Sequence, residues 1–281
     1  MCLYPPGDKI LTMVINIIKS WWKAICSHVL ISFFVVTTTA VLALGVLVAW
    51  QLASPTTASD YWERGMRRFS AKDYVGAISD LSRALELTPQ YDHYSRSTSY
   101  AARGAAYLQL GNPSRALSDL SRAIELRPPN VNMIDSLGLA DMYMLRATAH
   151  SQLGQHTMAA DDLYERCCLL PQDWRVLCDR GFELCLAGNY NKARDCYEQA
   201  MQMHPNDSRP IYGRGYVYFQ EEDYDSAIQD FSAAIAIQQD YGNAYFSRGY
   251  SYYKLGHIET AEEDRRRAIA IDRSFAKKKY E

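Results

Sequence analysis

The chain has 281 residues, of which 48% are hydrophobic and 22% charged, with 30 basic residues against 32 acidic ones. These proportions are those of a folded protein and exclude a disordered or collagen-like chain. Residues 1–57 hold three of the basic residues and one acidic residue, which leaves a net charge of −4 on residues 58–281. A domain with this balance has no electrostatic reason to bind nucleic acid.

The first distinctive feature along the chain is a segment without Asp, Glu, Lys or Arg between Lys23 and Asp60. Within it, Val29 to Trp50 form an apolar run of 22 residues, with Trp residues near both ends. At about 1.5 Å per residue, a helix of this length crosses the roughly 30 Å hydrocarbon core of a bilayer, and Trp favours the interfaces. We therefore expect a transmembrane helix over residues 24–51, between a short basic tail with an interfacial apolar segment (1–23) and a linker (52–57).

The flanks of this run indicate whether it is cleaved and how it is oriented. The run is longer than the apolar part of a signal peptide, so we expect an uncleaved anchor. Lys19 and Lys23 before it, with Asp60 and Glu63 after it, favour a cytoplasmic N-terminus and an extracytoplasmic domain. The five cysteines of residues 58–281 are an odd number without framework spacing, which favours a reducing compartment. We expect the extracytoplasmic placement, with the cytoplasmic one as the alternative.

The rest of the chain repeats with a period of 34 residues. Arg-Gly pairs begin at Arg180, Arg214 and Arg248, and an Ala occupies the twentieth place of each of six units. Each unit holds two stretches of helical periodicity; a Gly separates them in four units, and four units close on Pro. The units, numbered one to six, span residues 58–91, 97–130, 140–173, 174–207, 208–241 and 242–275, and a basic tail (276–281) follows.

Small residues recur where the two helices of a unit would touch. Gly or Ala stands at the eighth place of every unit, and helix axes about 8–10 Å apart leave room for little more. One helix pair cannot bury its apolar face alone, so the units must stack. Insertions of five residues (Asp92 to Arg96) and nine residues (Val131 to Leu139) separate units one to three.

These positions resemble the tetratricopeptide repeat family. Extending over 218 of the 281 residues, the resemblance is carried in unit two by Tyr100, Arg103, Gly104, Tyr107, Gly111, Ala116, Leu120, Ala123 and Pro128. It implies an all-α fold in which six helix-turn-helix tetratricopeptide repeats stack as a right-handed superhelical solenoid. It also implies a concave face, lined mostly by the first helix of each unit, that holds a peptide or a segment of a partner protein.

A further regularity connects the two helices of each unit. Arg stands at the seventh place of all six units and Asp at the twenty-third place of five, so the two can pair between helices. Unit four has Cys196 in place of the Asp, so Arg180 needs another partner, such as Asp195 or solvent. We expect a structural ladder, not a ligand site, made by Arg64–Asp80, Arg103–Asp119, Arg146–Asp162, Arg214–Asp230 and Arg248–Asp264.

The fifth, ninth and twelfth places of the first helices are candidate partner-binding positions. In units one, five and six these places hold large apolar side chains, most of them aromatic, which suit a groove that binds a peptide or an amphipathic helix. They also suit packing on one another, burial under the C-terminal tail, or a homodimer interface. The Lys and Asn with which family members hold acidic chaperone C-termini are absent from these places. In units five, six and one the candidates are Tyr212, Tyr216, Phe219, Phe246, Tyr250, Tyr253, Trp62, Met66 and Phe69.

Sequence motifs for catalysis, cofactors or metals are lacking. No HExxH, GxSxG or phosphate-loop sequence occurs, and the cysteines form no CxxC pair or Cys/His ligand spacing. We expect no enzyme activity, no cofactor and no bound metal, and we interpret as packing thiols Cys167, Cys168, Cys178, Cys185 and Cys196.

The sequence thus predicts a membrane-tethered adaptor or scaffold that binds a protein or peptide partner, itself membrane-associated, in the concave groove. One alternative is a structural module that homo-oligomerises, or builds a larger membrane assembly, through the aromatic face. A second alternative is a cysteine-dependent redox or metal-binding chaperone.

Overall fold

The structure, a computed structural model, describes residues 56–127 and 133–280. The predicted transmembrane helix (24–51), the tail before it and most of the linker (52–57) lie outside the described residues. Among the helices of the described ranges, none has an apolar stretch long enough to span a bilayer.

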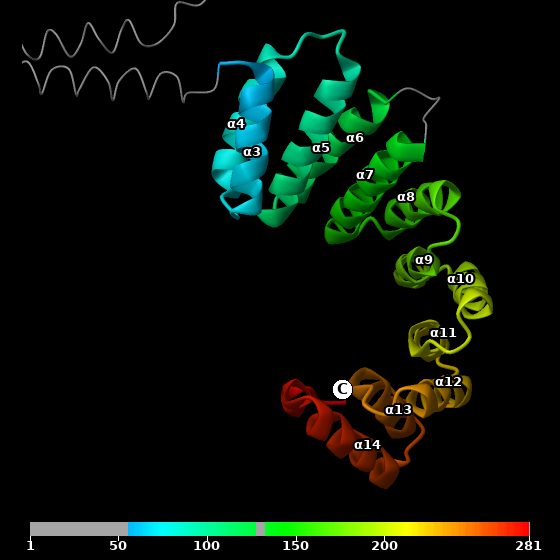
Figure 1. The fold of residues 1–281 in the computed structure, drawn as a ribbon. Helices are drawn as coiled ribbons and strands as arrows, with labels where there is room; N and C mark the ends of the chain where they lie inside the picture. The colour runs from blue at the N-terminus through cyan, green and yellow to red at the C-terminus, as the bar shows by residue number, and fades with distance from the viewer. Residues whose placement is uncertain (1–55, 128–132, 281) are drawn as a thin grey trace, which may run out of the picture. The chain divides into compact units, whose positions relative to one another are not determined.

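The described residues form twelve α-helices and one short 3-10 helix, η1 (Figure 1). Two helices fall in each of the six units, so the all-α fold of helix pairs that the periodicity predicts is confirmed. The helices are α3 (Ala58–Ser70), α4 (Tyr74–Leu87), α5 (His93–Gln109), α6 (Pro113–Glu125), α7 (Met133–Gln152), α8 (His156–Leu169), α9 (Trp174–Leu186), α10 (Tyr190–Met203), α11 (Ser208–Gln220), α12 (Tyr224–Ile237), α13 (Gly242–Lys254), α14 (Ile258–Ile271) and η1 (Arg273–Lys277).

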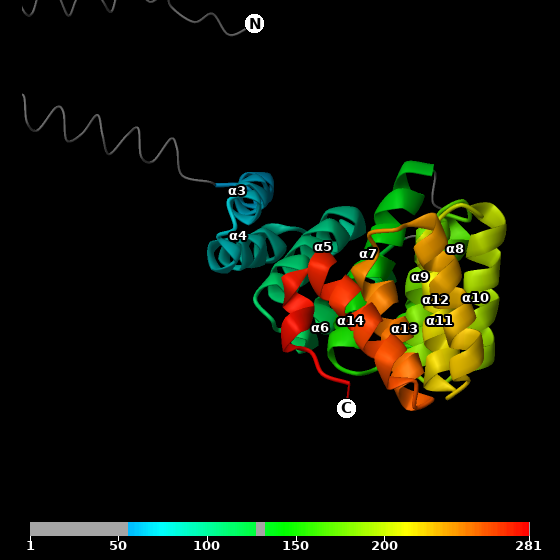
Figure 2. The same ribbon diagram turned by 90° about the horizontal axis from the view of Figure 1, so that it is seen from below.

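Helices that follow one another in sequence pack on one another in space. The two helices of each unit are in contact, and the second helix of each unit contacts the first helix of the next. Figure 1 shows α9 to α12 nearly end-on in this order, and Figure 2 shows the same helices from the side. First helices of neighbouring units are also in direct contact: α9 contacts α11, and α11 contacts α13. Each unit therefore buries its apolar face against its neighbours, as expected for a solenoid.

The residues inserted between units one, two and three lengthen helices. The helix α5 begins at His93 and has 17 residues, and α7 begins at Met133 and has 20, whereas α9 and α11 have 13 each. Asp92 caps α5, because its side chain accepts a hydrogen bond from the backbone N–H of Ser95. The first insertion therefore adds a turn at the start of α5 instead of a flexible linker.

The turn inside each unit requires a left-handed residue at its fifteenth place. Four units place Gly there, with φ between 69° and 84°. Units one and five place Lys72 (φ 63°) and Glu222 (φ 62°) in the same conformation. A side chain in this region costs about 1–2 kcal/mol relative to the right-handed helix, so units one and five contain backbone strain that the other four avoid.

The core of each unit is built around the recurring small residues. The Ala at the twentieth place is completely buried in all six units. The eighth place is equally tight: a Cβ on Gly104 would lie 2.8 Å from Cγ of Leu120. Leu81, Leu120 and Phe231 fill the remaining space as fully buried large side chains. The close approach of the two helices explains why only small residues occur at these places.

Candidate partner-binding site

The recurring Arg and Asp residues meet in five units. In unit two, Nε of Arg103 donates to Oδ2 of Asp119 at 2.7 Å and Nη2 donates to Oδ1 at 2.8 Å. The same two-pronged contact is made by Arg64–Asp80, Arg146–Asp162, Arg214–Asp230 and Arg248–Asp264. All five Asp side chains are buried. These pairs connect the helices of one unit and leave the carboxylates no room for an external ligand.

Unit four has no Asp at the twenty-third place, so its Arg180 makes a different contact. The guanidinium of Arg180 lies over the ring of Tyr164, 4.7 Å from the ring centroid. Its Nε is buried and has no hydrogen-bond partner among the described residues. Burial raises the pKa of the Cys196 thiol, and the neighbouring Arg180 acts in the opposite direction. Where the sequence suggested Asp195 or solvent as a partner, the structure thus gives Arg180 a contact with the ring of Tyr164.

The aromatic candidates of unit five pack mainly on other rings. Tyr212 lies 5.4 Å from Phe231 and 5.0 Å from Tyr241, between ring centroids, and its hydroxyl is within hydrogen-bond distance of Ser247. Phe219 lies 5.1 Å from Tyr250 of unit six and 5.5 Å from Tyr224. Tyr216 lies 6.2 Å from Phe182 of unit four. These side chains join neighbouring helices and are all at least half-buried.

The candidates of unit six are covered by the end of the chain. Phe275 of η1 stacks on Phe246 at 5.3 Å. Tyr280 lies 5.4 Å from Tyr250 and 5.6 Å from Tyr253, and its hydroxyl donates to the backbone carbonyl of Ala261 at 3.1 Å. Residues 273–280 thus occupy the surface on which a further helix would pack, and of the six aromatic candidates in units five and six only Tyr253 is exposed.

Of the three candidates in unit one, Trp62 lies at an open cavity. Phe69 packs edge-on against Tyr74 at 5.4 Å, and Met66 is half-buried. Trp62 lines a cavity of about 520 Å³ between α3 and α5. It is therefore the candidate that the structure brings to an open cavity.

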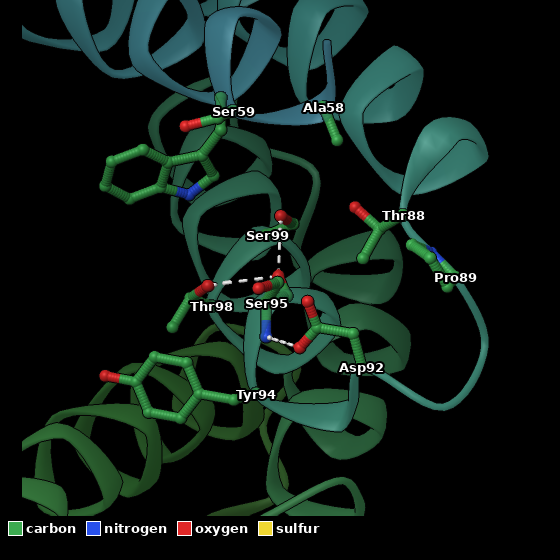
Figure 3. A pocket seen from close by; sticks show the side chains of 10 residues that line it. Ala58, Ser59, Thr88, Pro89, Asp92, Tyr94, Ser95, Thr98 and Ser99 are labelled. Carbon is green, nitrogen blue, oxygen red and sulfur yellow. Dashed lines mark hydrogen bonds between the residues drawn. The ribbon is translucent and has the colours of Figure 1, made fainter. Parts of the chain in front are cut away.

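Three segments form this cavity. The first turns of α3 contribute Ser59 and Trp62, the end of α4 and the loop after it contribute Thr88 and Asp92, and α5 contributes Tyr94, Ser95, Thr98 and Ser99 (Figure 3). Apart from Trp62, sequence reasoning missed these residues: Asp92, Tyr94 and Ser95 lie in the insertion, where the 34-residue count is interrupted, and the others lie outside the fifth, ninth and twelfth places. The Asp-x-x-Ser of a helix cap at Asp92 was the available signal.

A small hydrogen-bond network holds the polar side of the cavity. The backbone N–H of Ser95 donates to Oδ1 of Asp92 at 3.0 Å, and the hydroxyls of Thr98 and Ser99 donate to the carbonyl of Ser95 at 3.0 and 2.8 Å (Figure 3). The bonds from Ser95 lower the pKa of the Asp92 carboxyl below its usual range, so it is ionised at neutral pH. Nε1 of Trp62 is buried and has no hydrogen-bond partner in the described part of the chain.

The five cysteines of the domain are free thiols. Burial raises the pKa of Cys167 and Cys185 to about 11 and that of Cys178 to about 12, so these groups stay protonated at neutral pH. A protonated thiol is a poor nucleophile and a poor metal ligand. Within residues 56–127 and 133–280, no group of three or more His, Cys, Asp or Glu side chains is arranged to hold a metal ion. The chemistry of Cys167, Cys178 and Cys185 is therefore that of packing groups.

Comparison with known families identifies several of the units. Family models described as tetratricopeptide repeat match residues 97–130, 174–207 and 242–275, and one described as TPR repeat matches residues 215–256. These segments cover units two, four and six and most of unit five. Among curated proteins, no relative matches.

Solved structures of similar fold have low sequence identity to this chain. A tetratricopeptide repeat protein from Parabacteroides merdae ATCC 43184 is 18% identical, with a TM-score of 0.65 over 76% of this chain and 79% of that one. YrrB, described as a TPR protein with an unusual peptide-binding site, is 21% identical, with a TM-score of 0.56 over 66% of this chain and 89% of that one. MamA from Desulfovibrio magneticus RS-1 is 18% identical, with a TM-score of 0.52 over 64% and 96%.

At these identities the likeness is one of fold. Units one and three, which the family models leave unmatched, form helix pairs as the other units do. Together, these comparisons show that the matched segments are tetratricopeptide repeats and that the described residues share the fold of solved tetratricopeptide repeat proteins.

Proposed function

We propose that this protein is a membrane-tethered, non-enzymatic adaptor that binds a segment of a partner protein at the cavity between α3 and α5. Tetratricopeptide repeat proteins mediate protein–protein interactions, and YrrB of similar fold has a peptide-binding site. The single observation that supports this location is the cavity itself, which has a volume of about 520 Å³ and is lined by Trp62 and the exposed Tyr94. Ligand sites of this size combine apolar walls with a few oriented polar groups.

The aromatic surface of units five and six is a weaker candidate for partner or self-association. Its rings already contact one another and the chain end, so a second protein gains little apolar area there. The cavity at α3 and α5 offers unoccupied space beside Trp62 instead.

Membrane tethering adds to this function through local concentration. We propose that residues 24–51 anchor the chain, with the repeat domain on the extracytoplasmic side. Tethering makes capture of a partner in the same membrane effectively intramolecular, so a modest affinity suffices. Labelling an introduced, exposed cysteine from each side of intact membranes tests the orientation, in a chain without its natural cysteines. Labelling from the cytoplasmic side alone would overturn the extracytoplasmic placement.

Site-specific photo-crosslinking tests the binding site in cells that make the full chain. A photoreactive benzoylphenylalanine replaces Tyr94, which is 55% exposed at the cavity, or Val75, which is 69% exposed on α4 away from it. We expect a discrete crosslinked partner from position 94 that is lost when Trp62→Ala is added. Equal crosslinking from positions 94 and 75, or no effect of Trp62→Ala, would contradict the proposal.

A further inference from the structure

Of the six hydroxyl groups that line the cavity, three are committed as donors to backbone carbonyls. Thr88 donates to the carbonyl of Ala84 at 2.7 Å, and Thr98 and Ser99 both donate to the carbonyl of Ser95. A hydroxyl has one proton, so each of these oxygens can offer only its lone pairs to a ligand. These three hydroxyl groups therefore offer acceptors to the cavity, which favours a ligand that donates hydrogen bonds.

The charge of the cavity lining also favours a ligand that donates hydrogen bonds, and specifically a cation. Asp92 is the single carboxylate of the cavity lining, which includes no Lys, Arg or His. The bonds from Ser95 that lower its pKa keep it charged. A cation in the cavity would be attracted to this carboxylate, whereas an anion would be repelled by it and would have no positive charge in the lining to pair with.

Two aromatic rings complete the site. Trp62 and Tyr94 line opposite segments of the cavity, and the faces of Trp and Tyr attract cations. Tyr94 already shows this property, because the guanidinium of Arg127 lies 4.8 Å from its ring centroid. Arg127 and the nearby Arg96 are themselves held, by Ser97 and by the carbonyls of Leu85 and Thr88 respectively. Neither lines the cavity.

From these acceptors, the carboxylate and the rings, we propose that the cavity binds a basic side chain, the ammonium of Lys or the guanidinium of Arg, presented by a segment of the partner protein. This inference rests on the proposed function and specifies its ligand. The cation donates to Asp92 and to the hydroxyl oxygens of Thr98 and Ser99.

Capped tripeptides Gly-X-Gly, with X as Lys, Arg, norleucine or Glu, test the proposal on the full-length chain in detergent micelles. Titration followed by peptide NMR line broadening gives the dissociation constants. We expect the Lys or the Arg peptide to bind at least about tenfold more tightly than the norleucine peptide, because hydrogen bonds to a charged group are worth more than one tenfold step. Binding of the norleucine or Glu peptide as tight as that of both cationic peptides would overturn the proposal.

A matched pair of substitutions separates charge from folding. Asp92→Asn removes the charge but keeps a good helix cap, so we expect α5 to stay intact and cationic peptide binding to fall about tenfold. Asp223→Asn is the control, because Asp223 caps α12 through the same Asp-x-x-Ser contact and lies outside the cavity. Unchanged peptide binding in the Asp92→Asn chain would overturn the proposal.

The two experiments fail in different ways. If crosslinking from position 94 depends on Trp62 while the peptides show no cationic preference, the partner site stands and its basic ligand does not. If crosslinking is absent, the partner site itself falls, whatever the peptides do.

Discussion

At the scale of single residues, the buried ion pairs tie the two helices of a unit together. Asp119→Ala leaves Arg103 half-buried without its carboxylate, so we expect unfolding free energy to fall by about 1–3 kcal/mol. Thermal denaturation followed by circular dichroism measures the change. Glu125→Ala, in the same unit, removes an exposed partner of Arg122 and should change stability by less than about 0.5 kcal/mol. An unchanged melting temperature for Asp119→Ala would argue against a structural ladder.

Unit four offers the reverse experiment, in which a missing pair is added. Cys196→Asp places a carboxylate beside Arg180, whose Nε has no partner within the described ranges, and we expect stability to rise by about 1 kcal/mol. Cys185→Asp is the control: this buried position has no Arg beside it among its charged neighbours, so the same charge should destabilise. If both variants have a lower melting temperature than the parent chain, Arg180 does not form an ion pair with an Asp at position 196.

At the scale of the helix pair, the turn between the two helices favours Gly at one place because the backbone there is left-handed. Glu222 is left-handed, so Glu222→Gly removes a strained side chain and should raise stability by up to about 1 kcal/mol. Gly188→Ala should lower it by a similar amount, because a Cβ there meets no atom within 4 Å and only the backbone conformation changes. Differential scanning calorimetry of the two variants checks both signs. A loss of stability in Glu222→Gly would mean that chain entropy outweighs the strain.

Lengthened first helices are a second property at this scale. The extra turn of α5 provides Asp92, Tyr94 and Ser95, which a 34-residue unit without an insertion does not contain. The cavity between α3 and α5 therefore depends on a departure from the 34-residue repeat.

At the scale of the whole domain, stability should be local. Each unit contacts only its neighbours, so opening of one unit does not require opening of distant ones. In the Asp119→Ala chain we expect faster amide hydrogen exchange in α5 and α6, with protection in α11 to α14 unchanged. Uniformly faster exchange along all six units would indicate that the domain unfolds as one cooperative body.

The periodic part of the structure was predictable from sequence, and the aperiodic part was not. Helix pairs follow from spacing, and the Arg–Asp contacts follow from places seven and twenty-three, because one geometry is repeated. The burial of Phe246 and Tyr250 depends on a chain end that occurs once, and the cavity depends on an insertion that occurs once. The 34-residue period contains no information on features that occur once. The left-handed conformation of Lys72 and Glu222 could not be predicted from sequence either, because neither residue is Gly.

The chain end also keeps the period of the repeats. Phe275 stands 34 residues after Tyr241, and its contact with Phe246 at 5.3 Å reproduces that of Tyr241 with Tyr212 at 5.0 Å. For protein engineering, this means that the end of unit six is already shaped as a junction. A consensus repeat joined directly after residue 275 would enter in phase without a linker and would replace the contacts of Tyr280 with those of its own first helix.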